Sequence, residues 1–435
     1  MLDIQFIRDN AELVAEKSEQ KGYKVDIDRL LKLYEERNKF LKQREDLKRE
    51  SNEILKRSGK GKPSDQDMIK LKEIKQKLEH VRPLFRKADD DYFEDLLQIP
   101  NVSLDDVPVG ESEAENRISK EWGEKPHFAF KPKTHGELAE SRGLIDKERA
   151  TKVAGSRFAY IKGSLVELQF AIINLVIKTL ADENVLSKII EENKLSLKSQ
   201  PFEPVLPPYM LKTGVYVAMD RLEPQDDRYK VGEEGDDLWL EGSAEHTLGP
   251  MYKDEILDED RLPIRYLGYA TSFRREAGTY GKDTEGIVRM HQFDKLEMEV
   301  FGAPEDGLGE HLLLIAIQEY LMQLLNIPYR VVQKCTADIG KPNARGIDIE
   351  AWMPGQDRYL ETHTADYMTD YQARRLKTRL RRKQTGETEF IHTNDATAFA
   401  LGRTMAAIIE NYQLPDGHIT IPKVLSQYFG DREKI

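Results

Sequence analysis

Cationic, aromatic and acidic side chains recur at strand spacing within residues 262–301. Two runs of alternating apolar and polar residues flank the Gly-rich segment AGTYGKDTEG, and this pattern predicts two strands joined by a turn. On one face of the second strand, Arg289, Phe293 and Glu297 recur every four residues, roughly 13 Å per step. This order suits an elongated ligand that combines an aromatic ring with negative charge, such as a nucleotide with its phosphates.

The first strand carries a matching pair, because Arg274 and Glu276 share one of its faces. The opposite face of the second strand is apolar and is predicted to be core; it consists of Met290, Leu296, Met298 and Val300. A single charged residue on a sheet is more often only solvated. The convergence of several charges and a ring on one Gly-rich loop favours a ligand site, although the pattern alone does not name the ligand.

Two further segments carry isolated charges. Gly242, Ser243 and Ala244 precede Glu245, and a carboxylate on such a small-residue turn can grip an amino group. A helix capped by Ser243, with Glu245 in its first turn, explains the same residues equally well. Arg403 lies near the start of an apolar helical segment, where the helix dipole disfavours cations. We therefore expect an anion beside Arg403, from a protein carboxylate or a ligand phosphate.

The composition indicates a globular protein of two or three domains, with 435 residues, 33% charged and 39% hydrophobic. The one cysteine, Cys335, excludes an internal disulfide and a cysteine-based zinc cluster, so we expect no zinc. The first residues lack the basic and then apolar pattern of a signal peptide, and no apolar stretch reaches about eighteen residues. We expect a cytoplasmic protein without membrane contact.

Heptad patterns predict a long helical hairpin, the arm, over residues 28–97. The seam of its first helix consists of Leu33, Phe40, Leu47 and Ile54. Residues 58–65 predict the turn, Pro83 is expected to kink or interrupt the second helix, and each helix would be roughly 45 Å long. Coiled coils commonly serve dimerisation. However, residues 29–87 hold 19 Lys/Arg against 10 Asp/Glu in a chain of net charge −12, which favours nucleic-acid phosphates as the partner.

A Pro- and Asn-punctuated segment at residues 99–116 is predicted to be a linker. It divides the chain into an N-terminal domain, 1–98, and a second domain, 117–435. In the second domain, the helix at about 165–180 is apolar on most faces, which predicts burial in the core or in a subunit interface. The basic segment 372–383 is interpreted as an exposed helix face rather than a nucleic-acid contact.

Motifs along nearly the whole chain resemble, in order, those of seryl-tRNA synthetases. FRREAG with VRMHQFDKLEM resembles motif 2 of the class II synthetases, GRTMAAIIENYQ resembles motif 3, and VLPPYM resembles the end of motif 1, the dimer interface of that family. The resemblance implies an α+β fold: a long antiparallel α-helical coiled-coil arm at the N-terminus, then a class II catalytic domain with an antiparallel β-sheet flanked by helices.

The same resemblance implies a serine–tRNA ligase that uses ATP and Mg²⁺, grips tRNA(Ser) with its arm and forms a homodimer. One alternative is a synthetase-like paralogue with altered amino-acid specificity, or an amino-acid:carrier-protein ligase, but carrier-protein ligases lack such an arm. Another alternative is a catalytically inactive RNA-binding paralogue, which would have no need of a complete ATP site.

The resemblance also assigns the nucleotide end of the site. Arg274 would hold the α-phosphate and stabilise the charge that develops there. Phe293 would stack on adenine beside Glu276, and Arg289 and Arg403 would meet the outer phosphates. The full ATP-binding set that it implies is Arg274, Arg275, Glu276, Arg289, Phe293, Glu361, Thr362, His363, Thr364 and Arg403.

At the amino-acid end, Glu245 would take the serine ammonium and Glu297 the hydroxyl, while Glu361 would help hold Mg²⁺. The implied serine-binding set is Ser243, Ala244, Glu245, Arg274, Glu297 and Thr397. The implied catalytic set is Arg274, Glu276 and Arg403.

Several positions depart from the family pattern. These are Ser243 for Thr, His246-Thr247 for Val-Pro, Arg275 for Ser or Thr, Glu285 for Arg, Thr362-His363-Thr364-Ala365 for Ile-Ser-Ser-Cys, and Asp395-Ala396-Thr397-Ala398 for Asn-Gly-Ser-Gly. Several of them line the implied amino-acid pocket, and Thr397 keeps a hydroxyl. We favour a serine pocket built from other small hydroxyl residues; a shifted amino-acid preference is the alternative, because steric walls exclude threonine.

Overall fold

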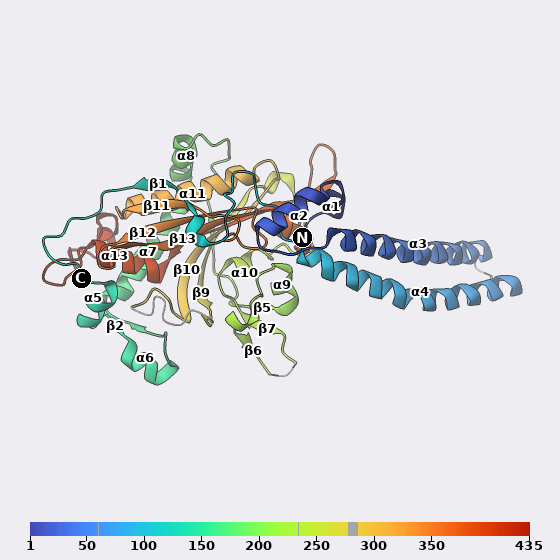
Figure 1. Ribbon diagram of the computed structural model, residues 1–435, viewed down its shortest axis with the longest axis horizontal. Helices are drawn as coiled ribbons and strands as arrows, with labels where there is room; N and C mark the ends of the chain where they lie inside the picture. Colours follow the sequence, from blue (N-terminus) through green and yellow to red (C-terminus); the bar gives the residue numbers. More distant parts are fainter. Residues whose placement is uncertain (60, 234, 277–285) are drawn as a thin grey trace. The chain divides into compact units, whose positions relative to one another are not determined.

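The computed structural model describes residues 1–59, 61–233, 235–276 and 286–435 (Figure 1). The chain forms two compact units, Met1–Val102 and Ser103–Ile435. The predicted Gly-rich turn, apart from its last residue, and Glu285 within it lie outside the described residues.

The N-terminal unit is entirely helical in its described part. Its helices are α1 (Ile4–Asp9), α2 (Ala11–Gln20), α3 (Ile27–Ser58) and α4 (Asp65–Gln98). The Asp26 and Ser64 side chains cap α3 and α4 by accepting hydrogen bonds from the backbone N–H groups of Arg29 and Asp67. The two long helices pair along their length, as Figure 1 shows, and at 1.5 Å per residue α3 is about 48 Å long. The predicted helical arm is confirmed.

Pro83 does not interrupt α4, which continues from Asp65 to Gln98, so of the two expected outcomes, a kink or an interruption, the interruption does not occur. Pro83 is exposed, and so is Glu79, whose carbonyl loses its helical partner. The unpaired carbonyl therefore faces water instead of the seam, and the helix tolerates the proline at small cost. Arg37 and Arg44 lie over the rings of Tyr92 and Phe85 across the seam, at 5.4 and 4.1 Å from the ring centroids.

The larger unit is built on an eight-stranded sheet in the order β1-β11-β12-β13-β16-β10-β9-β4, antiparallel except for the β4–β9 pair. Its strands are β1 (Arg117–Trp122), β4 (Glu203–Val205), β9 (Ile264–Phe273), β10 (Gln292–Gly302), β11 (Tyr329–Gln333), β12 (Arg345–Met353), β13 (Arg358–Thr369) and β16 (His392–Ala400). The flanking helices are α5 (His135–Ser141), α6 (Lys147–Ala154), α7 (Ser164–Leu180), α8 (Glu183–Glu192), α11 (Gly307–Leu324) and α13 (Leu401–Asn411). α11 packs on β13 and β16, and α13 packs on β10 and β12. This confirms the predicted α+β class.

Smaller sheets and short helices surround the large sheet. They are β2 (Ile145–Asp146) with β3 (Tyr160–Ile161); β5 (Met210–Lys212), β6 (Lys230–Val231) and β7 (Leu238–Leu240); β8 (Ile256–Asp258), β14 (Arg379–Arg381) and β15 (Thr388–Phe390); and the helices α9 (Thr213–Ala218), α10 (Glu245–Leu248) and α12 (Tyr371–Leu376). Within the described ranges, no single helix is long and apolar enough to cross a membrane, although α7 and α8, bent by 73° at their junction, pass that length and composition test as a pair.

The two predicted strands are shorter than their sequence pattern. β9 ends at Phe273 and β10 begins at Gln292, so Arg274, Glu276 and Arg289 lie beyond the strand ends and the prediction that they share strand faces is wrong. Glu276 adopts φ +52°, a left-handed conformation that strand pairing does not allow. Alternation of polar and apolar residues continues past the last ladder hydrogen bond, so it overestimates strand length.

The basic segment 372–383 is not an exposed helix. α12 ends at Leu376 and β14 follows, because Lys377 takes a left-handed conformation, φ +59°, that stops the helix. Arg375 donates to the carbonyls of Val217 and Ala218, and Arg382 pairs with acidic side chains on neighbouring segments. These arginines therefore stabilise the fold.

A buried ion pair joins β9 to α11. The Arg265 guanidinium donates to both carboxylate oxygens of Glu310, at 2.9 and 2.7 Å, and both side chains are fully buried. Replacing Arg265 by methionine leaves an unpaired buried carboxylate, so we expect a loss of about 3–5 kcal/mol of unfolding free energy. Urea denaturation followed by tryptophan fluorescence reports this, since the three tryptophans all lie in the larger unit. The double variant Arg265→Met/Glu310→Leu should recover most of the loss; if it is no more stable than the single variant, the pair is not the cause.

Candidate active site

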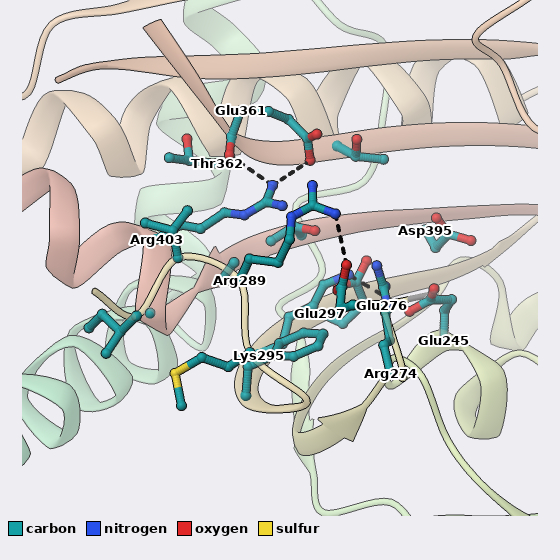
Figure 2. A pocket seen from close by; sticks show the side chains of 18 of the residues that line it. Glu245, Arg274, Glu276, Arg289, Lys295, Glu297, Glu361, Thr362, Asp395 and Arg403 are labelled. Carbon is teal, nitrogen blue, oxygen red and sulfur yellow. Dashed lines mark hydrogen bonds and ion pairs between the residues drawn. The ribbon is translucent and has the colours of Figure 1, made fainter. Parts of the chain in front are cut away.

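Eleven of the predicted site residues line one cavity of about 220 Å³ (Figure 2). They are Glu245, Arg274, Glu276, Arg289, Phe293, Glu297, Glu361, Thr362, Thr364, Thr397 and Arg403. They come from the segment after β9, from β10 and the segment before it, from β13 and β16, from the first turn of α13, and from α10, which carries Glu245. Gly402 allows the close approach at α13, because a Cβ there would lie 2.6 Å from the carbonyl oxygen of Ile287.

Four predicted residues do not line the cavity. Ser243 and Ala244 are fully buried behind it, and the Ser243 Oγ accepts a hydrogen bond from Lys295 at 2.8 Å. Arg275 donates to the carbonyl of Arg228, outside the cavity lining. His363 is buried, with its Nδ1 2.8 Å from the Thr362 hydroxyl. Strand alternation explains His363, because its neighbours in β13, Thr362 and Thr364, occupy the other face.

Two arginines at one end of the cavity are held by carboxylates. Arg289 pairs with Glu276 at 2.7 Å, and Arg403 donates to the Glu361 carboxylate at 2.8 Å and to its carbonyl at 2.9 Å, as Figure 2 shows. Burial raises the pKa of Glu361, but Arg403 and other cations outweigh it and hold that pKa below its usual value. The anion expected beside Arg403 is therefore Glu361.

Arg274 also lines the cavity. Its Nε donates to the Gly242 carbonyl at 2.9 Å, and its guanidinium lies 5.4 Å from the ring centroid of Phe293. The backbone contact fixes the side chain from one side, which leaves the remaining guanidinium N–H groups toward the cavity. An arginine held in this way is suited to a carboxylate or a phosphate.

The other end of the cavity is a buried acid–base cluster around Lys295. Its ammonium group lies 2.6 Å from Glu297, 2.8 Å from the Ser243 hydroxyl and 3.9 Å from Glu245. Burial would raise the pKa of Glu245, but the cations Lys295 and Arg221 hold it below its usual value, so this carboxylate is ionised. Its Oε2 atom is buried and accepts no hydrogen bond from the described residues. An ionised oxygen without a donor is prepared for a cationic ligand.

The floor of the cavity holds charges that the sequence interpretation did not assign. Asp395 pairs across the sheet with Glu299 and with Asp366, which sets three carboxylates in one row on β10, β16 and β13. Arg221 lies 3.3 Å from Asp395 and 3.8 Å from Asp366. Burial raises the pKa of Asp395 to about 8 and raises that of Glu299 well above its usual value. The alternation that selected Glu297 also pointed to Lys295 and Glu299, whereas Arg221 lies in a segment without a pattern.

Comparison with known proteins identifies the class of this chain. Residues 229–412 match the family profile described as tRNA synthetase class II core domain (G, H, P, S and T), and residues 1–103 match the seryl-tRNA synthetase N-terminal domain. The catalytic unit is thus that of a class II aminoacyl-tRNA synthetase.

Similar proteins cover the full chain and name the family. Serine–tRNA ligase of Bacillus subtilis is 37% identical over 100% of this chain and 99% of its own length. The crystal structure of seryl-tRNA synthetase from Pyrococcus horikoshii complexed with ATP is 37% identical, with a TM-score of 0.85 over 100% of this chain and 99% of that one. The cytoplasmic serine–tRNA ligase of Naegleria fowleri in complex with AMP is 28% identical, with a TM-score of 0.82 over 100% and 98%. The chain belongs to the seryl-tRNA synthetase family, which confirms the resemblance and the predicted ATP-dependent ligase activity as that of its family.

Proposed function

We propose that this chain joins serine to tRNA(Ser) in two steps. In the first, a carboxylate oxygen of serine attacks the α-phosphorus of ATP and pyrophosphate leaves, which forms seryl-adenylate. In the second, a hydroxyl group of the terminal ribose of the tRNA attacks the activated carbonyl carbon, and AMP leaves. The observation that carries the proposal is the buried, ionised Glu245, which lines the same cavity as Arg274 and whose Oε2 accepts no hydrogen bond from the described residues.

At the amino-acid end, Glu245 would accept the α-ammonium group of serine. The hydroxyl would then lie beside Glu297 and Thr397, both buried cavity residues. A site that binds a hydroxyl through buried polar groups rejects alanine strongly, because alanine would leave those groups unpaired. Ser243 and Ala244 support this end from behind, Ser243 through its contact with Lys295.

At the nucleotide end, Phe293 would stack on adenine beside Glu276, while Arg289 and Arg403 would exchange their carboxylate partners for the outer phosphates. Arg274 would stabilise charge on the α-phosphate, in the position where amino acid and nucleotide meet. Thr362 and Thr364 face the same end, whereas Arg275 and His363 would act from outside the cavity lining. Catalysis is then positioning and charge stabilisation, without a protein nucleophile.

Magnesium fits this set of donors. Among the described residues, no group of three or more His, Cys, Asp or Glu side chains could hold a metal by itself. Magnesium commonly takes one or two protein carboxylates and completes its shell with water and phosphate oxygens, and Glu361 supplies such a carboxylate at the cavity. The ion would neutralise negative charge on the phosphates.

We further propose that the arm, residues 28–97, holds the tRNA, and that the chain acts as a cytoplasmic homodimer. The domains would be 1–98 and 117–435, joined by 99–116. Apolar side chains exposed on α7 and after β4 support the dimer, since Phe170 is 54% and Leu206 is 77% exposed.

Amino-acid-dependent ATP–pyrophosphate exchange tests the first step without tRNA. Across serine, threonine, alanine, glycine and cysteine, we expect exchange with serine to exceed that with any other by at least about a hundredfold, because the hydroxyl and ammonium groups both find buried carboxylates. Exchange with another amino acid would move the function to that substrate. A folded protein that binds ATP but exchanges with none of the five would favour an inactive paralogue.

A further inference from the structure

His246 lies directly behind the carboxylate that would bind the serine ammonium group. Its side chain is buried in α10, and its Nε2 atom is 3.4 Å from Oε1 of Glu245. The other oxygen of Glu245, Oε2, accepts no hydrogen bond from the described residues and lies 3.9 Å from the Lys295 ammonium group, and Glu245 lines the cavity. His246 therefore contacts one oxygen of the carboxylate, while the second keeps its hydrogen-bonding capacity.

The surroundings of Nδ1 fix the tautomer of His246. The backbone N–H of Gly242 donates to Nδ1 at 3.1 Å, so Nδ1 carries no proton. The Tyr216 hydroxyl lies 2.8 Å from the same atom, and burial raises the pKa of Tyr216 to about 12, so this hydroxyl stays protonated and donates. Burial holds the pKa of His246 well below its usual value. The ring is thus neutral, with its one proton on Nε2, the atom that lies 3.4 Å from Oε1 of Glu245.

The same peptide also connects His246 to Arg274. Gly242 donates its N–H to His246 and accepts the Nε–H of Arg274 through its carbonyl, at 2.9 Å. Gly242, in the segment between β7 and α10, therefore links two parts of the proposed serine site. Its N–H contacts His246, which lies behind Glu245, and its carbonyl holds Arg274. A Cβ on Gly242 would lie 3.1 Å from the His246 ring, so the packing here is tight.

We propose that His246 is a positioning residue that orients Glu245 toward the α-ammonium group of the amino-acid substrate. The inference rests on the proposed function. A buried histidine that only fills core space is the simpler alternative, and it predicts no difference between ligands with and without an ammonium group. A neutral ring N–H packed 3.4 Å from one oxygen of the carboxylate restricts its rotation and lowers the reorganisation needed when the ammonium group binds.

Two variants of similar shape test the roles of the two ring nitrogens separately. In His246→Asn the side-chain amide oxygen takes the place of Nδ1, so the acceptor for Gly242 remains while the donor to Glu245 is lost. In His246→Gln the amide N–H takes the place of Nε2, so the donor remains. In serine-dependent pyrophosphate exchange we expect His246→Asn to raise the KM for serine about tenfold, while kcat and the KM for ATP stay within about twofold of wild type. For His246→Gln the KM for serine should stay within about threefold of wild type.

L-Glycerate, which replaces the ammonium group of serine by a hydroxyl, provides the control ligand. Its inhibition constant should differ by less than about twofold between wild type and His246→Asn, since it lacks the group that Glu245 binds. Equal losses for serine and glycerate, or a serine KM unchanged in His246→Asn, would overturn the proposal.

If His246→Asn fails to fold, Tyr216→Phe provides a second test, because it removes one of the two donors to Nδ1. This variant should raise the serine KM about threefold without changing the inhibition constant of glycerate, and equal effects on the two ligands would overturn the proposal. If the wild-type protein exchanges with no amino acid, both the proposed function and this inference are rejected. If the wild type exchanges with serine but the variants affect serine and glycerate equally, only the inference is rejected.

Discussion

Replacing Arg274 by alanine should reduce serine-dependent ATP–pyrophosphate exchange about a thousandfold while leaving the fold intact. The guanidinium lines the described cavity, where it is held by the Gly242 carbonyl and lies over the Phe293 ring, and in the proposed site it would meet the α-phosphate. Removing one preorganised donor from a developing charge typically costs about two to three orders of magnitude in rate. Exchange under saturating serine and ATP, with thermal unfolding measured in parallel, checks both parts.

Two control variants sharpen this result. Arg274→Lys keeps the charge but loses the planar fork, so its activity should fall between those of wild type and Arg274→Ala. Arg330→Ala removes an arginine of β11 that pairs with Glu350 outside the cavity lining, and should exchange at the wild-type rate. Unchanged exchange in Arg274→Ala would refute the role assigned to this residue, and an equal loss in Arg330→Ala would attribute the effect to the fold.

Reversing the charge of exposed lysines on the arm should abolish most tRNA charging and spare serine activation. Lys56, Lys72 and Lys75 are exposed along α3 and α4, on a segment with an excess of positive charge. If each contacts a phosphate, replacing all three by glutamate should weaken tRNA binding by about a hundredfold or more near physiological salt. The slope of log affinity against log salt concentration should fall by about two to three units. Filter binding at several salt concentrations and serylation assays measure both quantities.

The matched control reverses three exposed lysines of the larger unit, Lys152, Lys188 and Lys194, and so makes the same change in net charge. That variant should charge tRNA within about threefold of wild type. Pyrophosphate exchange should be unaffected in both triple variants, since neither set lines the cavity. Full charging by the arm variant would mean that the tRNA is held elsewhere.

The sequence predicted the elements of this fold better than their ends. Heptads identified the arm because a repeated apolar seam has no other explanation at that length, and the apolar face of β10 is buried at Leu296, Met298 and Val300 as expected. The prediction of strand ends failed where the geometry depends on a single backbone angle, as at Glu276. The effect of Pro83 depends on which side of the helix is exposed to water. Neither property produces a periodic pattern in the sequence.

Alternation can find the cavity residues that lie on regular strands, whereas those outside the strands, such as Arg274 and Glu245, were assigned through the family resemblance. Alternation along β10 leads from Glu297 to Lys295, whose contacts organise the amino-acid end. Arg221 and His246 enter from segments outside the large sheet, and their role depends on three-dimensional contacts with Asp395 and Glu245. For His246 the signal was only a departure from the family pattern, which marks a position without explaining it.

The two ion pairs at the nucleotide end have a consequence for product release. Glu276 and Glu361 neutralise Arg289 and Arg403 whenever the phosphates are absent, so each arginine has a partner to return to. Pyrophosphate leaving the proposed site would not have to expose two bare cations, because the carboxylates take its place. The same carboxylates compete with free phosphate and pyrophosphate for the arginines. In the proposed site, the resting protein would therefore resist inhibition by pyrophosphate, and release of pyrophosphate would not delay turnover.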